Sequence, residues 1–385
     1  MTSTSLVVST DKSKQLIGVS SSVDSASGRL SGLSSPVLQL RGHSGALFCC
    51  RFSADGALLA TAGMDRTIRL WDVFSPSCRN TLTLTGHTGP VLDLCWAPDS
   101  ASIVSASADR TLALWDAATG SRLRRFTGHR LVVNSVSVPR TWNTDALYDD
   151  ALLLRPDVAS PVFASVSDDA TARLWDPRAG ARHCATVVYK HSCPLTTCCF
   201  GGDGTDTLYV AGLDGAILGL DLRKISSSTA TDEEMKDDAA GEEEGEKKGA
   251  MATARLTLSG HTDTVTGLSM SKDGSFLLSN AMDKQLRVWD VRPFAPENRC
   301  VKILVGHEHS FEKNLLRCAW GSSSRYVTAA SSDGMVNVWN TTNRAIVHRL
   351  PGHAGSVNDV ALHPSQPIIA SAGSDGTVFI GEIKL

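Results

Sequence analysis

Serine, histidine and aspartate recur together along the 385-residue chain, and these residue types form the nucleophile, base and orienting acid of a hydrolase triad. Four of the histidines precede their aspartate by 22 residues, and five of the aspartates precede a tryptophan by six. A catalytic site is needed once, whereas this set returns at regular intervals along the chain. The repetition therefore favours a structural lock over a hydrolase.

The recurring set predicts a buried hydrogen-bond network in each unit, in which the aspartate accepts from histidine and tryptophan and a serine two residues before the aspartate takes part. Units one, four, five and seven lack that serine, and units four and seven also lack the tryptophan. Those two units are predicted to be the least stable, by roughly 1–3 kcal/mol for each missing buried contact. The predicted network residues are His43, Asp65, Trp71, His87, Ser107, Asp109, Trp115, His129, Ser167, Asp169, Trp175, His261, Asp283, Trp289, His307, Ser331, Asp333, Trp339, His353 and Asp375.

Six Gly-His pairs and one Lys-His pair open seven units of about 43 residues once two insertions are removed, close to the roughly 40–45 residues of a WD repeat. Short apolar segments with Asp-Gly turns lie between these markers, as expected for strands. The sequence thus predicts an all-β fold, a seven-bladed WD-repeat β-propeller. An open ring would leave unpaired strand edges. We therefore expect Pro36–Leu40 to supply the missing fourth strand of the last blade.

Residues 1–35 are rich in Ser and Thr and are predicted to form a disordered tail, with the propeller over 36–385. Two insertions are expected, one at 139–161 within blade three and one at 226–254 between blades four and five. The second contains the run 232–248, with nine acidic and three basic residues, and is predicted to be a solvated linker rather than an acidic contact for a basic partner. The first carries Trp142 and Tyr148, which could pack on the rim or on a partner.

The sequence carries only weak signals for metal binding, catalysis or membrane insertion. His183, Cys184, His191 and Cys193 do not have the spacing of a familiar zinc site, so no metal is predicted. The chain has no phosphate-binding loop and no metalloprotease or hydrolase motif, so no cofactor, small-molecule substrate or catalytic residue is expected. No apolar run is long enough for a membrane span, and the N-terminus is unlike a signal peptide. The ten cysteines are expected to be buried thiols in a reducing compartment.

Two loops are candidate partner-binding sites, because binding residues favour loops on a rigid scaffold. The first follows the third strand of blade five, where Pro293 and Pro296 should end strand pairing and leave a stiff extended segment that presents Arg292 and Phe294. The second precedes the first strand of blade six and contains Phe311 and Lys313.

The segments NAMD, WDVRPFAP and FEKNLLRC are not required by a WD repeat, and together with LPGHAGSVNDVALHP and the closing GEI they resemble the family of WD-repeat subunits of the U5 small nuclear ribonucleoprotein of the spliceosome. The resemblance spans residues 37–385 and is weaker through blades three and four. It implies a non-catalytic nuclear scaffold that binds the large central U5 protein and other spliceosomal proteins in pre-mRNA splicing. The insertion at 139–161 and the acidic linker depart from that family.

A second interpretation rests on Trp175-Asp176-Pro177-Arg178 and Trp289-Asp290-Val291-Arg292. A WD-x-R ending resembles the motif by which propellers dock onto adaptors of cullin-type ubiquitin ligases, which would make the protein a substrate receptor. The net charge of −3 includes the acidic linker, so the remainder is mildly basic without the clustered stripe of a nucleic-acid binder. Any RNA contact is therefore expected to be peripheral.

Overall fold

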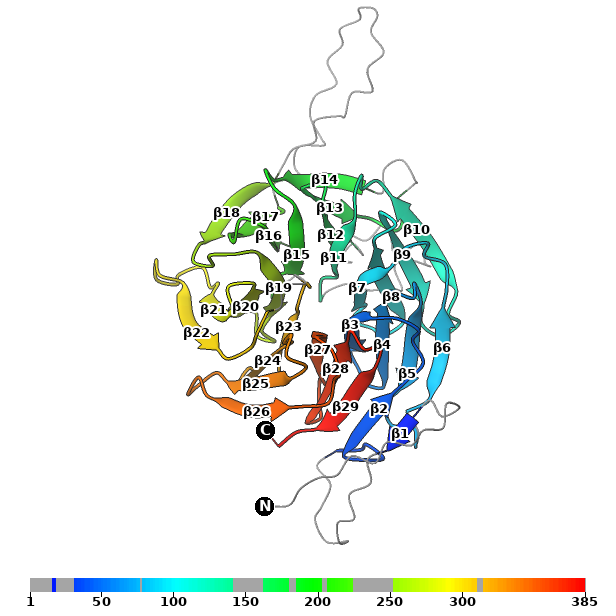
Figure 1. Cartoon of the computed structure of the whole chain (residues 1–385). Coiled ribbons are helices and arrows are strands. Elements are labelled where there is room, and N and C mark those ends of the chain that lie inside the picture. The colour runs from blue at the N-terminus through cyan, green and yellow to red at the C-terminus, as the bar shows by residue number, and fades with distance from the viewer. Residues whose placement is uncertain are drawn as a thin grey trace, which may run out of the picture.

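The fold is known from a computed structural model, and Figure 1 shows the arrangement of its strands. It describes residues 16–18, 31–76, 78–140, 162–179, 185–202, 206–223, 252–309 and 314–384. Among these residues, no helix is long and apolar enough to cross a bilayer.

Seven antiparallel sheets surround a centre, and the first strand of each blade is innermost (Figure 1). Blade one contains β3 (Leu47–Phe52), β4 (Leu58–Gly63), β5 (Ile68–Asp72) and β6 (Asn80–Leu84), and blade two contains β7 (Val91–Trp96), β8 (Ser102–Ser107), β9 (Thr111–Asp116) and β10 (Arg122–Thr127). Blade three contains β11 (Val133–Ser137), β12 (Phe163–Ser167), β13 (Thr171–Trp175) and β14 (Ala185–Lys190), and blade four contains β15 (Leu195–Phe200), β16 (Thr207–Gly212), β17 (Ile217–Asp221) and β18 (Thr253–Leu258). Blade five contains β19 (Val265–Met270), β20 (Phe276–Ala281), β21 (Gln285–Asp290) and β22 (Cys300–Val305), and blade six contains β23 (Cys318–Trp320), β24 (Tyr326–Ala329), β25 (Val336–Asn340) and β26 (Ile346–Leu350).

Blade seven closes the ring with strands from both ends of the chain. It contains β27 (Val357–Leu362), β28 (Ile368–Gly373), β29 (Val378–Glu382), β2 (Val37–Leu40) and β1 (Leu16–Gly18), in that order. In the pairing of β2 with β29, Leu38 lies opposite Ile380 and Leu40 opposite Val378. The prediction that the N-terminal strand completes the last blade of a seven-bladed propeller is confirmed.

The ordered propeller begins earlier than the predicted boundary at residue 36. Leu33 is buried in the core between blades seven and one, and Ser31 donates a hydrogen bond of 2.5 Å to Glu382. Strand β1, which pairs with β2, also lies within residues 1–35, where no strand was expected. The boundary was placed too late because short Ser- and Gly-rich segments carry no periodic signal even when they dock on a sheet.

The core consists of seven clusters, each located where two neighbouring sheets face each other. Adjacent residues of an inner strand therefore contact different neighbours: Cys49 packs toward blade two and Cys50 toward blade seven. Strands β8 and β11 are buried at every position, because the sheets on both sides cover them. The Trp71, Trp115, Trp175, Trp289 and Trp339 side chains are among the largest that are fully buried.

The two predicted insertions lie mostly outside the described residues. Trp142 and Tyr148 fall in the undescribed range 141–161. Arg140 is described, and it donates to the Lys272 and Ser271 carbonyls, so the start of this connection in blade three contacts blade five. The second insertion was predicted between blades four and five, but it falls within blade four, because β17 and β18 on either side of it pair in one sheet. It ends before residue 254, because Thr253 and Ala254 already pair in β18.

Candidate functional site

The Ser/His/Asp set forms a linear chain of hydrogen bonds in five blades. In blade two, His87 Nδ1 lies 3.0 Å from Asp109 Oδ2, and His87 Nε2 lies 2.7 Å from Ser105 Oγ. Trp115 Nε1 donates to the same Ser105 hydroxyl at 2.8 Å. The equivalent contacts join His43 to Asp65 and Thr61, His129 to Asp169 and Ser165, His261 to Asp283 and Ser279, and His353 to Asp375 and Ser371. Trp71, Trp175 and Trp289 donate to the hydroxyls of their own blades.

We call this arrangement the blade network, and one protonation pattern satisfies all its members. Tryptophan can only donate, so the hydroxyl accepts from the indole and donates its own proton to histidine Nε2. The histidine is then neutral and donates from Nδ1 to the ionised aspartate. Burial raises the pKa of Asp65, but the interactions with His43 and the hydrogen bonds from Thr67 together outweigh it and hold that pKa at about 2.

Asp109, His87 and Ser105 have the connectivity of a hydrolase triad, yet their surroundings prevent that chemistry. Ser105 is fully buried, so no substrate can reach its oxygen. The indole of Trp115 already occupies the hydroxyl oxygen that would attack. Since the same arrangement returns in other blades, its role is to tie the connection before each first strand to the second and third strands.

The structure differs from the predicted network in which hydroxyl takes part and what the tryptophan contacts. The bridging hydroxyl is four residues before the aspartate, not two. Ser107 instead donates to the Pro90 carbonyl at 2.9 Å and accepts from the Asp109 backbone N–H at 3.2 Å. Ser167 likewise accepts from the Asp169 N–H. These serines shape the turn, and the tryptophans donate to the hydroxyl rather than to the aspartate.

Blade six has the full predicted set but not the blade network. Neither ring nitrogen of His307 has a hydrogen-bond partner among the described residues, and Trp339 donates to the Val305 carbonyl. The bridging position is occupied by Ala329, so the hydroxyl that would join these two rings is missing. Ser331 binds the backbone of Glu308, and Asp333 accepts from the Met335 N–H. Burial, together with the neighbouring His309, lowers the pKa of His307 to about 4.

Blade seven keeps most of the blade network although its tryptophan position is Gly381. The His353 ring packs edge-on against Phe379, with the ring centroids 4.8 Å apart. Phe379 also lies beside Gly352, in the place that tryptophan occupies beside Gly86 in blade two. The phenyl ring thus replaces the indole as packing but not as a donor. That blades four and seven are the least stable remains a prediction.

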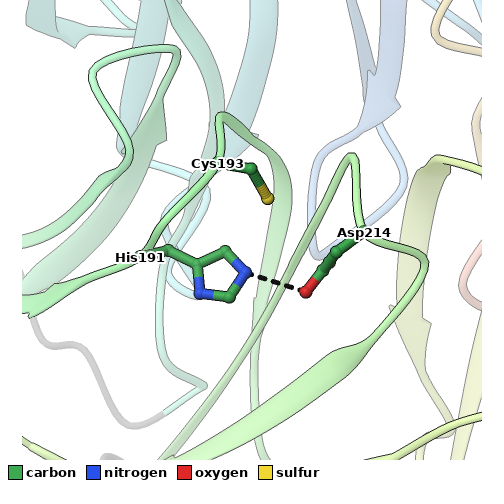
Figure 2. A group of neighbouring side chains, drawn as sticks. All are labelled: His191, Cys193 and Asp214. Carbon is green, nitrogen blue, oxygen red and sulfur yellow. Dashed lines mark hydrogen bonds and ion pairs between the residues drawn. The ribbon is translucent and has the colours of Figure 1, made fainter.

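In blade four the His-Asp pair has a different geometry and an additional neighbour. His191 presents Nε2, not Nδ1, to Asp214 Oδ2 at 2.8 Å, and the Cys193 sulfur lies close to both (Figure 2). Burial and the Asp214 carboxylate raise the pKa of the Cys193 thiol. Two residues of the set considered for zinc, His183 and Cys184, fall outside the described residues. The repeat pattern marks Asp214 only as the aspartate of its unit, and no sequence signal predicts its approach to Cys193.

A non-repeated charge cluster, which was not predicted from the sequence, occupies the centre of the ring. It consists of Arg51, Asp93, Arg317 and Asp359. Arg51 forms ion pairs with Asp359 and Asp93, and Arg317 lies 3.4 Å from Asp93. Arg317 also donates to the Asn134 carbonyl at 2.8 Å and to Ser135, which links it to blade three. The cluster therefore ties together blades one, two, three, six and seven.

Arg51, Asp93 and Arg317 of this cluster line a cavity of about 390 Å³, whose walls come from the inner strands of all seven blades. Its two arginines face two aspartates, so the cluster is balanced in charge. The signal available in the sequence was a charged residue inside an otherwise apolar inner strand, as at Asp93 in VLDLCW. Arg317 also explains part of the segment FEKNLLRC, because its side chain completes this cluster.

The candidate segment after the third strand of blade five forms a turn rather than the predicted stiff extended segment. The Ala295 N–H donates to the Arg292 carbonyl at 3.2 Å, because Pro293 has the backbone angle that favours the second position of a β-turn. The Phe294 side chain is 100% exposed. Arg292 forms an ion pair of 2.5 Å with Asp290 and lies over the Phe276 ring at 5.7 Å. Phe311 and Lys313 lie outside the described residues.

The arginine of the WD-x-R ending makes the same intramolecular contact in two other blades. Arg178 binds Asp176 at 3.1 Å, and Arg223 binds Asp221 at 2.8 Å. An arginine two residues after the aspartate that ends the third strand therefore clips the strand end. The motif consequently has a structural use in this chain that does not require an adaptor.

Seven sheets that close into a ring, with a hydrogen-bond network repeated from blade to blade, define a WD-repeat β-propeller, which is a scaffold. The family described as "WD domain, G-beta repeat" matches residues 34–72, 78–116, 120–176, 253–290, 298–340 and 344–380. The range between 176 and 253, which includes the first three strands of blade four, is outside these matches.

Named relatives align with almost the whole chain. The chain is 41% identical over 356 residues to the human U5 small nuclear ribonucleoprotein 40 kDa protein, covering 92% of this chain and 86% of that protein. It is 37% identical to the protein of the same name from Dictyostelium discoideum and 38% identical to the pre-mRNA-splicing factor cwf17 of Schizosaccharomyces pombe, with 92% of this chain covered in each case and 87% and 90% of the relatives. The chain belongs to this family of WD-repeat proteins.

Proposed function

We propose that the protein is a non-catalytic scaffold of the U5 small nuclear ribonucleoprotein, located in the nucleus, that acts in pre-mRNA splicing by binding the large central U5 protein. The observation that carries the proposal is 41% identity to the human U5 40 kDa protein over 92% of the chain. The segments NAMD and NLLRC also support it, because a WD repeat does not require them and they carry the resemblance to this family. In this chain their residues build the ring. Asn280 and Thr266 both donate to the Leu316 carbonyl, which fixes blade six on blade five.

The turn 291–296 supports a protein partner. A phenylalanine that is fully exposed gains nothing from the fold, whereas an aromatic side chain on a partner surface can contribute much of the binding energy. Asp290 and the Phe276 ring hold Arg292 in place beside it, with 59% of the arginine side chain still accessible. The pair therefore presents an apolar anchor and an oriented cation, with little conformational entropy left to lose in the arginine.

The charge pattern supports protein contacts over RNA contacts. Arg178, Arg223 and Arg292 each bind an aspartate of their own blade, and Arg51 and Arg317 face aspartates in the central cavity. These arginines contribute less to an external field than their number suggests. Any RNA contact is therefore expected to be peripheral, and no small-molecule substrate is needed.

Affinity purification from nuclear extract tests this function. The tagged wild-type protein is expected to recover U5 RNA and the large U5 protein. Phe294→Ala should lower that recovery by about tenfold or more, because loss of an interface anchor costs at least roughly 1.4 kcal/mol. Leu131→Ala, at a site that is 51% exposed on blade three, is the matched control and should keep full recovery.

Three outcomes would contradict parts of the proposal. Recovery of a ubiquitin-ligase adaptor without U5 RNA would favour the substrate-receptor interpretation of the WD-x-R endings. Equal recovery with Phe294→Ala and wild type would remove the turn 291–296 from the interface. Replacement of Phe311 and Lys313 by Ala tests the other candidate loop, and unchanged recovery there would remove that loop.

A further inference from the structure

Blade four brings three different metal-binding side chains together at the boundary with blade three. His191 directly follows β14, Cys193 lies in the connection to β15, and Asp214 lies in the turn between β16 and β17. One donor atom from each, a nitrogen, a sulfur and an oxygen, lies within 4.8 Å of the other two. Figure 2 shows the three side chains pointing toward a common point.

This cluster is not a version of the blade network. The bridging hydroxyl is replaced by Val210 and the tryptophan by Leu220, both fully buried, so the imidazole has neither of its usual partners. The ring is accordingly turned, and Nε2 rather than Nδ1 faces the aspartate. His191 Nδ1 has no hydrogen-bond partner among the described residues, which leaves the ring free to rotate toward an ion.

The cysteine occupies a position that is glycine in three other blades and carries Leu131, Asp263 or His309 in the remaining three. Two residues after the network histidine, blades one, two and seven have Gly45, Gly89 and Gly355. A Cβ atom at Gly89 would lie 2.8 Å from the Asp109 nitrogen, and one at Gly355 would lie 2.5 Å from Ser374 Oγ. Blade four has opened this space, and the side chain that fills it aims a sulfur at the His-Asp pair.

The donor set and its exposure suit a transition metal. Imidazole, thiolate and carboxylate are the three ligand types of protein zinc sites, and separations below 4.8 Å require only small side-chain movements to reach Zn²⁺. The His191 and Asp214 side chains are 13% and 35% exposed, so an ion can enter from solvent. Asp214 Oδ1 accepts from the Ala216 N–H at 3.2 Å, which orients Oδ2 toward the site.

We propose that His191, Cys193 and Asp214 bind a divalent transition-metal ion, for which Zn²⁺ has the best-matched ligand preference, with water in the fourth position. The ion joins the end of the outer strand of blade three to two connections of blade four. It thereby supplies a cross-link at the blade from which the hydroxyl and the tryptophan of the blade network are missing. This inference is independent of the proposed role in splicing.

Cobalt binding to the full-length, chelator-treated protein tests the site. We expect one Co²⁺ per chain, with the absorption bands of a four-coordinate site and a sulfur-to-cobalt charge-transfer band. Zn²⁺ should displace the cobalt and raise the melting temperature. Cys193→Ser should abolish the charge-transfer band, and Cys193→Ser and Asp214→Asn should each weaken Zn²⁺ binding by more than the roughly 10- to 100-fold that loss of an outer-shell partner costs.

Cys300→Ser is the matched control, because Cys300 is also a partly buried free thiol but lies on blade five. It should keep both the charge-transfer band and the Zn²⁺ affinity. The proposal is overturned if the wild type shows no charge-transfer band, if the band survives Cys193→Ser, or if Cys300→Ser removes it equally. If Asp214→Asn does not fold, Cys193→Ser decides alone, because this loop residue is outside the core clusters.

Discussion

Replacing Ser105 and Ser107 by alanine, one at a time, separates the bridging hydroxyl of blade two from its near neighbour. Both serines are fully buried on β8, so the two changes remove the same atom from equally dry surroundings. Ser105→Ala deprives both His87 Nε2 and Trp115 Nε1 of their partner. Each buried polar group left unpaired costs about 1–3 kcal/mol, so the expected loss in the free energy of unfolding is roughly 2–6 kcal/mol.

Ser107→Ala should lower the free energy of unfolding by less, because its main acceptor keeps another hydrogen bond. The Pro90 carbonyl also accepts from the Ala108 N–H at 2.9 Å and therefore remains bonded. The Asp109 N–H loses its acceptor, and the Gly89 carbonyl loses its 3.1 Å share of the same hydroxyl proton, so the expected cost is about 1–2 kcal/mol. Urea unfolding of the two variants and the wild type, followed by tryptophan fluorescence, gives both values. A Ser107→Ala variant that is as destabilised as Ser105→Ala would refute this reasoning.

Three further predictions concern blade six and the central charge cluster. Ala329→Ser restores the bridging hydroxyl between His307 and Trp339, so the urea midpoint should rise by the equivalent of about 1 kcal/mol, and an unchanged or lower midpoint would contradict this. His307 has a folded-state pKa of about 4 against an ordinary histidine value of 6.5, so its neutral form stabilises the protein fully above pH 6.5, and this stability is lost as the pH falls through 4. The loss in the free energy of unfolding should reach up to about 3 kcal/mol in the wild type. The His307→Gln variant should lose less stability than the wild type between pH 6.5 and 4.5. Asp65, with a pKa near 2, stays ionised in this window and does not contribute to the difference. Arg317→Leu removes the nearer of the two ion-pair partners of the buried Asp93 and leaves it Arg51 at 3.8 Å, so thermal unfolding should show a loss of up to about 3–5 kcal/mol. A loss below about 1 kcal/mol would show that the cluster contributes little.

The ring and its closure were predictable because they depend on local and repeated signals. The spacing of His, Asp and Trp sets the length of each unit, and the similarity of VLQL to other fourth strands identified β2 as the closing strand. The bridging hydroxyl was missed because it depends on strand register. Ser105 lies opposite Ala113, which places it diagonally across from Trp115 on one face, whereas Ser107 lies at the strand end.

The central charge cluster was missed for a different reason. Its members come from four blades, and Arg51 and Asp359 are 308 residues apart. They meet only because the ring closes, and no periodicity marks them. His191 and Asp214 match the repeat pattern as a degenerate unit. Blade four combines Val210 at the bridging position with Leu220 at the tryptophan position, but no sequence pattern shows that Cys193 would lie beside them.

Closure of the last blade by β2 also determines when folding can finish on the ribosome. The strand Val37–Leu40 leaves the exit tunnel long before its partner Val378–Glu382 is made. At roughly 5–20 residues per second, synthesis of the intervening chain takes roughly 20 to 70 s, during which β2 has no partner strand. A transcript that stops before β29 therefore yields a polypeptide with two unpaired edges, which makes it a substrate for chaperones and proteases.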